Sequence, residues 1–167
     1  TNTSYMCGGE VPDDILAWMD SFGSQKKQKI NQCELLVVIA AVMTFGDILR
    51  DRELLVWVDN VPALSAAVHG YSHAPEMASL SNALHLLLAG LSAIPRFLHV
   101  PGKANPADIP SRVPFLRRDG SHVLDPARLS PADARVVAAL CACYRPMVLP
   151  TAAQLGNLEY FILRGAG

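Results

Sequence analysis

Apolar and polar positions along the chain separate helical from extended segments. Residues 30–49 are apolar on most sides, and the length of this stretch predicts a helix that is buried on several faces. Residues 54–58 form a short apolar run with β-branched side chains, which is typical of a central strand. A polar, lysine-bearing connection over residues 21–29 precedes the predicted helix.

Capping residues indicate where the next elements begin and end. Asn60 suits the N-cap of a helix, Pro62 its first turn and Gly70 its C-cap. Pro75 opens a second helix, which is expected to run to about Leu91. The pattern beyond it predicts a strand over 94–100, a turn at Pro101 and Gly102, and a short helix that begins at Asn105 and Pro106.

The two ends of the chain carry weaker signals. In residues 1–20 the turn signal Pro12-Asp13-Asp14 lies between short apolar stretches, which predicts a hairpin. Near the C-terminus, the start signal at Ser130-Pro131 predicts a helix over 134–144, and another short helix is expected over 152–163.

Alternating strands and helices predict a layered α/β domain whose sheet is at least partly parallel. With 167 residues, the chain is long enough for one full core and too short for two comfortable domains. Ligands of parallel sheets bind outside the carboxyl ends of the strands. Asp59 directly follows the predicted 54–58 strand, so we expect it at such an end.

Three acidic residues fall on three separate elements. Glu34 lies in the apolar helix, Asp59 after the strand and Asp108 in the first turn of the last short helix. Carboxylates from separate elements are what two-metal hydrolysis of a phosphodiester needs. Each also has a plainer interpretation. Asp59 could be a turn former, Glu34 a solvated helix residue and Asp108 a partner of the helix dipole. The functional hypothesis therefore rests on the order and spacing of all three.

Charge and cysteine content narrow the class of protein. The formal net charge is -1, whereas domains that bind nucleic acid usually carry a basic field, so polynucleotide contacts must come from local patches or attached domains. The spacing of the 4 cysteines does not fit a disulfide framework, which indicates a reduced, intracellular chain. The apolar run over residues 35–43 is shorter than the roughly 20 residues of a bilayer span, so no membrane segment is expected.

Three motifs surround the three acidic residues. They are Cys-Glu-Leu-Leu over 33–36, Val-Asp-Asn-Val-Pro-Ala over 58–63 and, the most specific, His-Val-Pro-Gly-Lys-Ala-Asn-Pro-Ala-Asp-Ile-Pro-Ser-Arg over 99–112. The first two resemble the middle motifs, and the third is similar to the closing motif, of the ribonuclease H domains at the end of retrotransposon reverse transcriptases. The resemblance covers residues 1–112, roughly two thirds of the chain.

The resemblance implies an RNase H-like fold over residues 1–112, in which helices flank a mixed five-stranded sheet whose first strand is truncated here. Residues 113–167 would form a C-terminal helical extension. The implied activity is hydrolysis of the RNA strand of an RNA/DNA hybrid with two Mg²⁺ or Mn²⁺ ions, beside the polymerase domain of the same polyprotein. The implied metal ligands are Asn2, Glu34, Asp59 and Asp108. The expected substrate contacts are Asn60, Lys103, Asn105 and Arg112, of which Lys103 and Arg112 belong to a basic cluster beside Asp108.

The first motif departs from the family pattern at Asn2. Thr1-Asn2-Thr3-Ser4 stands where the family has Thr-Asp-Ala-Ser, so an amide replaces the aspartate that bridges both metals. An amide lacks the charge that holds two divalent cations close together, and binding of two metals should weaken. An engineered substrate trap, a naturally degenerate domain and an aspartate further upstream all stay open as explanations. The alternative function is a catalytically inactive connector or interaction domain of the same fold.

Overall fold

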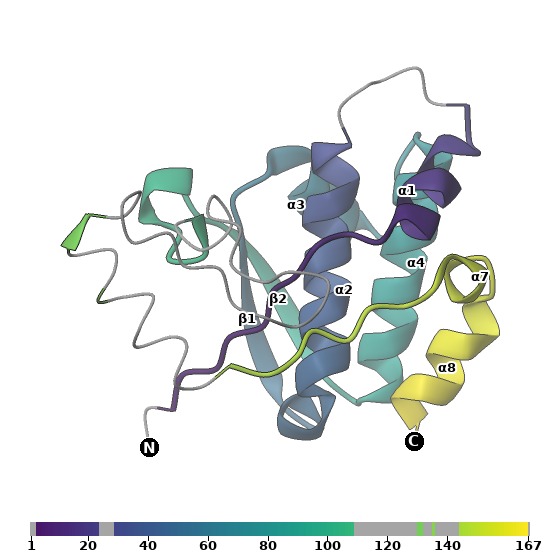
Figure 1. Cartoon of the computed structure of the whole chain (residues 1–167). Helices are drawn as coiled ribbons and strands as arrows, with labels where there is room; N and C mark the ends of the chain where they lie inside the picture. Colours follow the sequence, from purple (N-terminus) through teal and green to yellow (C-terminus); the bar gives the residue numbers. More distant parts are fainter. Residues whose placement is uncertain (1–2, 24–28, 109–129, 132–134, 136–143, 167) are drawn as a thin grey trace. The chain divides into compact units, whose positions relative to one another are not determined.

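The structure, a computed structural model, describes residues 3–23, 29–108, 130–131, 135 and 144–166. The chain forms two compact units. The larger unit comprises Val11–Val100 and Val148–Gly167, and the smaller comprises Thr1–Glu10 and Pro101–Met147. Most of the regular structure belongs to the larger unit, whose elements (Figure 1) in chain order are α1 (Asp13–Asp20), α2 (Ile30–Leu49), β1 (Glu53–Val58), α3 (Val61–His69), α4 (Pro75–Gly90), β2 (Ile94–His99), α7 (Ala152–Leu155) and α8 (Leu158–Ala166).

The sheet of the larger unit consists of β1 and β2, which pair in parallel. The register runs from Glu53 opposite Ile94 to Val58 opposite His99, and α3 and α4 form the connection between the strands. Within the described residues the sheet has these two strands only, so the expected five-stranded mixed sheet is wrong. The broader α/β prediction is compatible with the structure, because a parallel pair needs a crossover of this helical kind.

The N-terminal hairpin expected over residues 1–20 is also wrong. Residues 13–20 form α1, in which Ile15 and Met19 are fully or almost fully buried. These two side chains are four residues apart and therefore lie on one face of a helix. Pro12 precedes the helix, and Asp13 and Asp14 occupy its first turn. Acidic side chains there stabilise a helix by interacting with the positive end of its dipole. The Pro-Asp-Asp signal thus marks a helix start instead of a hairpin turn.

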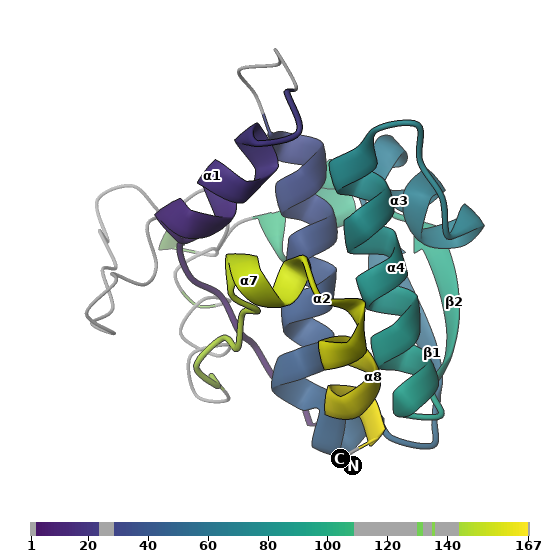
Figure 2. The same cartoon turned by 90° about the vertical axis from the view of Figure 1, so that its right-hand side faces the viewer.

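Helix α2 confirms the prediction for residues 30–49. One side of the helix enters the core through Leu35, Leu36, Ile39 and Met43. By length and composition alone, α2 is long and apolar enough to cross a membrane, a test that the core helix of a soluble protein also passes. In Figure 2, α2, α4 and α8 stand side by side next to the strand pair.

The C-terminal segment packs against α4. The single helix expected over 152–163 is divided in the structure, with α7 ending before Gly156 and α8 beginning at Leu158. Thr151 and Gln154 form a capping box at the start of α7, with a 3.2 Å bond from the Gln154 amide to the Thr151 hydroxyl. Phe161 of α8 is completely buried.

The smaller unit has little regular structure among its described residues. Met6 forms an isolated parallel bridge with Tyr144, and the Tyr144 hydroxyl donates to the Gly8 carbonyl at 3.0 Å. Residues Gly102–Ala104 form a 3₁₀ turn. The helix expected from Asn105 is described only as far as Asp108, and most of the helix expected over 134–144 lies outside the described residues.

Candidate functional site

Asp59 lies at the carboxyl end of β1, as the sequence predicts. The strand ends at Val58, whose side chain is buried, and Asp59 is half-buried in the bend that follows. The amide of Val100 donates to the Val58 carbonyl at 3.1 Å, which holds the ends of the two strands together. The Asp59 carboxylate is therefore carried on a fixed backbone at the edge where ligands of parallel sheets bind.

Asn60 makes two side-chain contacts that fix the turn after Asp59. Its Oδ1 accepts the backbone N–H of Ala63 at 2.9 Å and so caps the N-terminus of α3. Its Nδ2 donates to Oδ1 of Asn31 at 2.9 Å. The second bond joins the β1–α3 turn to the first turn of α2, two segments that lie 29 residues apart in the chain.

Glu34 lies on the helix face that Asn31 presents to Asn60. Residues three apart in an α-helix are neighbours on one face, and Glu34 follows Asn31 by one turn. Glu34 is half-buried, like Asp59. The Asn31–Asn60 bond thus brings the elements that carry Glu34 and Asp59 together at one corner of the larger unit. We call Asn31, Glu34, Asp59 and Asn60 the acidic corner.

A second polar link supports the start of α2. Nε2 of Gln32 donates to Oε1 of Glu76 at 2.9 Å, and both side chains are buried. Glu76 lies in the first turn of α4 after Pro75, where the helix dipole favours a carboxylate. A buried carboxylate that loses its partner is costly, so this bond fixes the position of the first turn of α2 against α4. The link also holds the neighbouring Asn31 in place.

No motif in the sequence identified Asn31, Gln32 or Glu76 as part of the site. A signal was available for the first two, because they are adjacent amide side chains in the first turn of an otherwise apolar helix. Glu76 had the weaker signal of an acid after a helix-starting proline. Their partners lie 29 and 44 residues away in sequence, so the pairs themselves follow only from the tertiary structure.

Asp108 and Asn105 belong to the smaller unit. Oδ1 of Asn105 accepts the Ala107 N–H at 3.0 Å, and the Asp108 amide donates to the Asn105 carbonyl at 3.1 Å. These bonds form a local turn that supports the half-buried Asp108. The expected three acids therefore do not fall within one compact unit, whereas Glu34 and Asp59 do.

The other expected site residues are less informative. Lys103 is exposed in the 3₁₀ turn. Its contact with substrate phosphate stays a prediction. Asn2 and Arg112 lie outside the described residues.

The donor atoms of the acidic corner suit a hard cation. Carboxylate and amide oxygens are the ligands that Mg²⁺ prefers, and Mg²⁺ keeps several waters when a protein offers only one or two carboxylates. Within the described residues, no group of three or more His, Cys, Asp or Glu side chains could hold a metal ion. Two carboxylates are too few for a closed protein cage and would suit one hydrated cation.

Cys33 reports on the environment of Glu34. Burial, and to a lesser extent the neighbouring carboxylate of Glu34, raises the pKa of the Cys33 thiol above its ordinary value of 9.0, while Lys29 opposes the shift. Because the thiolate is the reactive form, we expect Cys33 to react with iodoacetamide more slowly at pH 8 than it does in the unfolded chain. Glu34→Gln should accelerate the reaction. Peptide mass spectrometry of Cys33 measures both rates, and a folded rate equal to the unfolded one would contradict this.

The same shift gives a pH dependence of stability. The folded state holds the Cys33 proton more tightly than the unfolded state, so the unfolded chain releases it first as the pH rises through about 9. This contribution to stability is therefore present below the unfolded pKa and declines as the pH rises through the folded pKa. Urea unfolding of wild type and Cys33→Ser between pH 7 and 10 measures the decline.

Asn60 should matter for stability through both of its contacts. We expect Asn60→Ala to reduce the free energy of unfolding by about 1–3 kcal/mol, from loss of the cap and of the bond to Asn31. Asn60→Ser keeps a capping hydroxyl but cannot reach Asn31. Its free energy of unfolding should therefore fall by less than that of Asn60→Ala, because it loses the bond to Asn31 and keeps the cap. Urea denaturation compares the two. Equal losses for both variants would mean that the bond to Asn31 contributes everything and the cap nothing.

The corner and the turn at Asp108 hold the residues of the three motifs that resemble ribonuclease H domains. Glu34 and Asp59 come from its middle motifs and Asp108 from its closing motif. The resemblance rests on these motifs and on their order in the chain. Comparisons with protein-family models, with curated proteins and with solved structures find no significant match to the chain.

Proposed function

We propose that this chain serves as a ribonuclease H-type domain, which hydrolyses the RNA strand of an RNA/DNA hybrid beside the polymerase domain of a retroelement polyprotein. The observation that carries the proposal is the Asn60–Asn31 hydrogen bond of 2.9 Å, which holds the elements of Glu34 and Asp59 at one corner. The motif resemblance supplies the reaction and the substrate. The hydrogen bond and the order of the motifs thus both support Glu34 and Asp59 as the metal ligands.

In this proposal Glu34 and Asp59 would hold a divalent cation, which supplies charge stabilisation and an activated water when bound. The chain's own contribution is to fix the two carboxylates. Asn60 anchors Asp59 through the cap of α3, and Asn31 and Gln32 anchor the first turn of α2. Carboxylates fixed in this way lose little freedom when a cation binds.

Hybrid recognition would use the ribose 2′-hydroxyl and phosphates, because the narrow deep groove of A-like duplexes hides the base edges. Exposed Lys103 is the described cation nearest in sequence to Asp108 and would contact phosphate. With a formal net charge of -1, the isolated chain should bind duplex weakly and with strong salt sensitivity. The polymerase domain would supply most of the affinity.

A connector without activity is the second candidate, and Asn2 favours it. The amide at the first motif removes one negative charge from the proposed metal ligands. In that case the polar links of the corner would serve only to join α2, α3 and α4. The domain would then act through its surfaces and not through chemistry.

Cleavage of a labelled RNA/DNA hybrid with Mg²⁺ or Mn²⁺ separates the two functions. We expect Asn2→Asp to cut the RNA strand faster than wild type, while matched RNA/RNA and DNA/DNA duplexes stay intact. The metal-free reaction, with chelator added, serves as the control. If neither protein cuts the hybrid with either ion, the nuclease proposal fails and the connector stands.

A further inference from the structure

Helix α2 begins without a side-chain cap of its own. Its N-cap residue is Lys29, whose side chain pairs with Asp20 and makes no capping hydrogen bond within the described part of the chain. The first four N–H groups of an α-helix have no intrahelical partner, and helix ends fray when nothing else holds them. Helices α3 and α7 differ, because Asn60 and Thr151 cap them. The start of α2, which carries Glu34, therefore depends on contacts with other elements.

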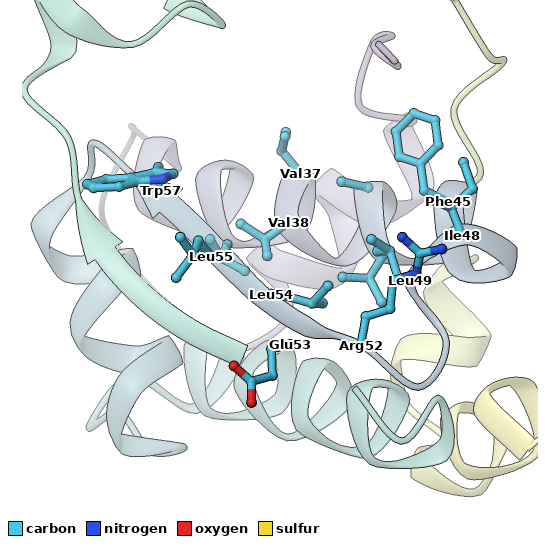
Figure 3. Close-up of a pocket in the computed structure, with 13 residues that line it drawn as sticks. Val37, Val38, Phe45, Ile48, Leu49, Arg52, Glu53, Leu54, Leu55 and Trp57 are labelled. Atoms are coloured by element: carbon cyan, nitrogen blue, oxygen red, sulfur yellow. The ribbon is translucent and has the colours of Figure 1, made fainter. Parts of the chain in front are cut away.

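Packing of α2 against β1 gives this start little support. An apolar groove of about 550 Å³ opens between the two elements, lined by Val37, Val38 and Phe45 among other residues of α2 and by residues 52–57. Figure 3 shows side chains of both elements around it. The groove leaves part of the facing surfaces of α2 and β1 without mutual contact. The placement of Glu34 beside Asp59 therefore depends more strongly on the polar links at the start of α2.

The Gln32–Glu76 hydrogen bond is the deepest of these links. Gln32 is 6% exposed and Glu76 3% exposed, so water does not compete for the 2.9 Å bond between them. Glu76 belongs to α4, whose Met77, Leu80 and Leu84 are buried in the core of the larger unit. The carboxylate is thus fixed by its own helix and holds the uncapped turn of α2 from outside.

We propose that Glu76 is a positioning residue of the acidic corner, which holds the first turn of α2 through Gln32 and so raises the affinity of the corner for a divalent cation. The inference rests on the proposed function, because it requires Glu34 and Asp59 to bind a cation. Glu76 itself does not touch the cation. Partners that orient metal ligands from outside typically contribute 10- to 100-fold to metal affinity.

Mg²⁺ titration of the ¹⁵N-labelled full chain tests the proposal, with the amide shifts of Asp59 and Asn60 as the readout. The test variant combines Gln32→Met with Glu76→Met. Methionine has nearly the shape of both side chains, and replacing both partners of a buried hydrogen bond by apolar groups of similar shape can leave stability nearly unchanged. We expect the urea midpoint to stay close to that of wild type, whereas the Mg²⁺ dissociation constant of the corner rises about tenfold.

Two further variants separate the bond from charge and from general loosening. Glu76→Gln removes the same charge as the methionine pair but keeps an acceptor oxygen for Gln32, so it should recover most of the affinity. Ser81→Ala removes another buried link of α4, the 2.7 Å bond from the Ser81 hydroxyl to the Ala66 carbonyl. It should lower the urea midpoint and leave the dissociation constant within about twofold, because this link lies at the other end of α3 from Asn60.

Each outcome decides for or against Glu76. Unchanged Mg²⁺ affinity in the methionine pair overturns the positioning role and leaves the proposed cation site standing. A tenfold loss in Glu76→Gln overturns it as well, because the effect is then one of charge, and an equal loss in Ser81→Ala would show general loosening of α4. If wild type itself gives no saturable shifts at Asp59 and Asn60, the cation site fails and the positioning role fails with it.

Discussion

In the Asn2→Asp protein, Asp59→Asn and Glu34→Gln should each lower the rate of hybrid cleavage by about 100-fold. A loss of that order is typical when one fixed group that stabilises transition-state charge is removed. Both substitutions keep the shape of the side chain and remove its charge, so the fold should persist. Product formation at saturating Mg²⁺ under single-turnover conditions is the measurement.

Asp51→Asn is the matched control for these acids. Asp51 is an exposed acid at the opposite end of β1, and its φ of 57° is one that asparagine tolerates. Its replacement changes the net charge of the protein by the same amount. Cleavage should stay within about twofold of the parent, because screened surface charges contribute little at this distance. If Asp51→Asn lowers the rate as much as Asp59→Asn does, the effect is one of general charge and not of a site.

Gly165→Ala should destabilise the larger unit by about 1–3 kcal/mol. A Cβ at Gly165 would lie 2.7 Å from Cα of Gly90 and 2.8 Å from the Leu87 carbonyl oxygen, so α8 must move away from α4. The backbone atoms that it meets cannot turn aside as a flexible side chain could. The shift would also weaken the 2.9 Å bond from the Arg50 guanidinium to the Gly165 carbonyl.

Gly156→Ala is the control for that substitution. Its Cβ would meet the Ala153 carbonyl oxygen at 3.5 Å, an ordinary contact, and its φ of -80° suits any residue. We expect a change within about 0.5 kcal/mol, as for most substitutions away from special features. Urea unfolding monitored by circular dichroism compares the two. Equal midpoints for Gly165→Ala and wild type would show that α8 does not depend on close contact with α4.

Local signals predicted the elements that flank Asp59. Each signal acts within a few residues: the apolar stretch, the Asn60 cap, Pro62 and the left-handed Gly70, whose φ is 66°. The bounds of α2, β1 and α3 agree closely with those predicted from these signals. The sequence alone thus placed Asp59 at a strand end and Glu34 in a helix. Neither inference needed knowledge of a distant contact.

Non-local structure was predicted less well. The five-stranded sheet came from motif resemblance, whereas pairing in a sheet depends on ladders between distant segments, and residues 3–10 contribute a single bridge at Met6. In residues 13–20 a turn signal outweighed the four-residue spacing of Ile15 and Met19, which is helical. The polar links at Asn31 and Gln32 join segments that no local pattern connects.

Paramagnetic broadening by Mn²⁺ tests most directly whether Glu34 and Asp59 form one cation-binding corner. In a ¹⁵N-labelled sample, substoichiometric Mn²⁺ should selectively broaden the amide signals of the first turns of α2 together with those of Asp59 and Asn60. Excess Mg²⁺ should restore them, because both ions prefer oxygen ligands. If Mn²⁺ broadens only one of the two segments, or leaves both sharp while other acids respond, the acidic corner does not bind a cation.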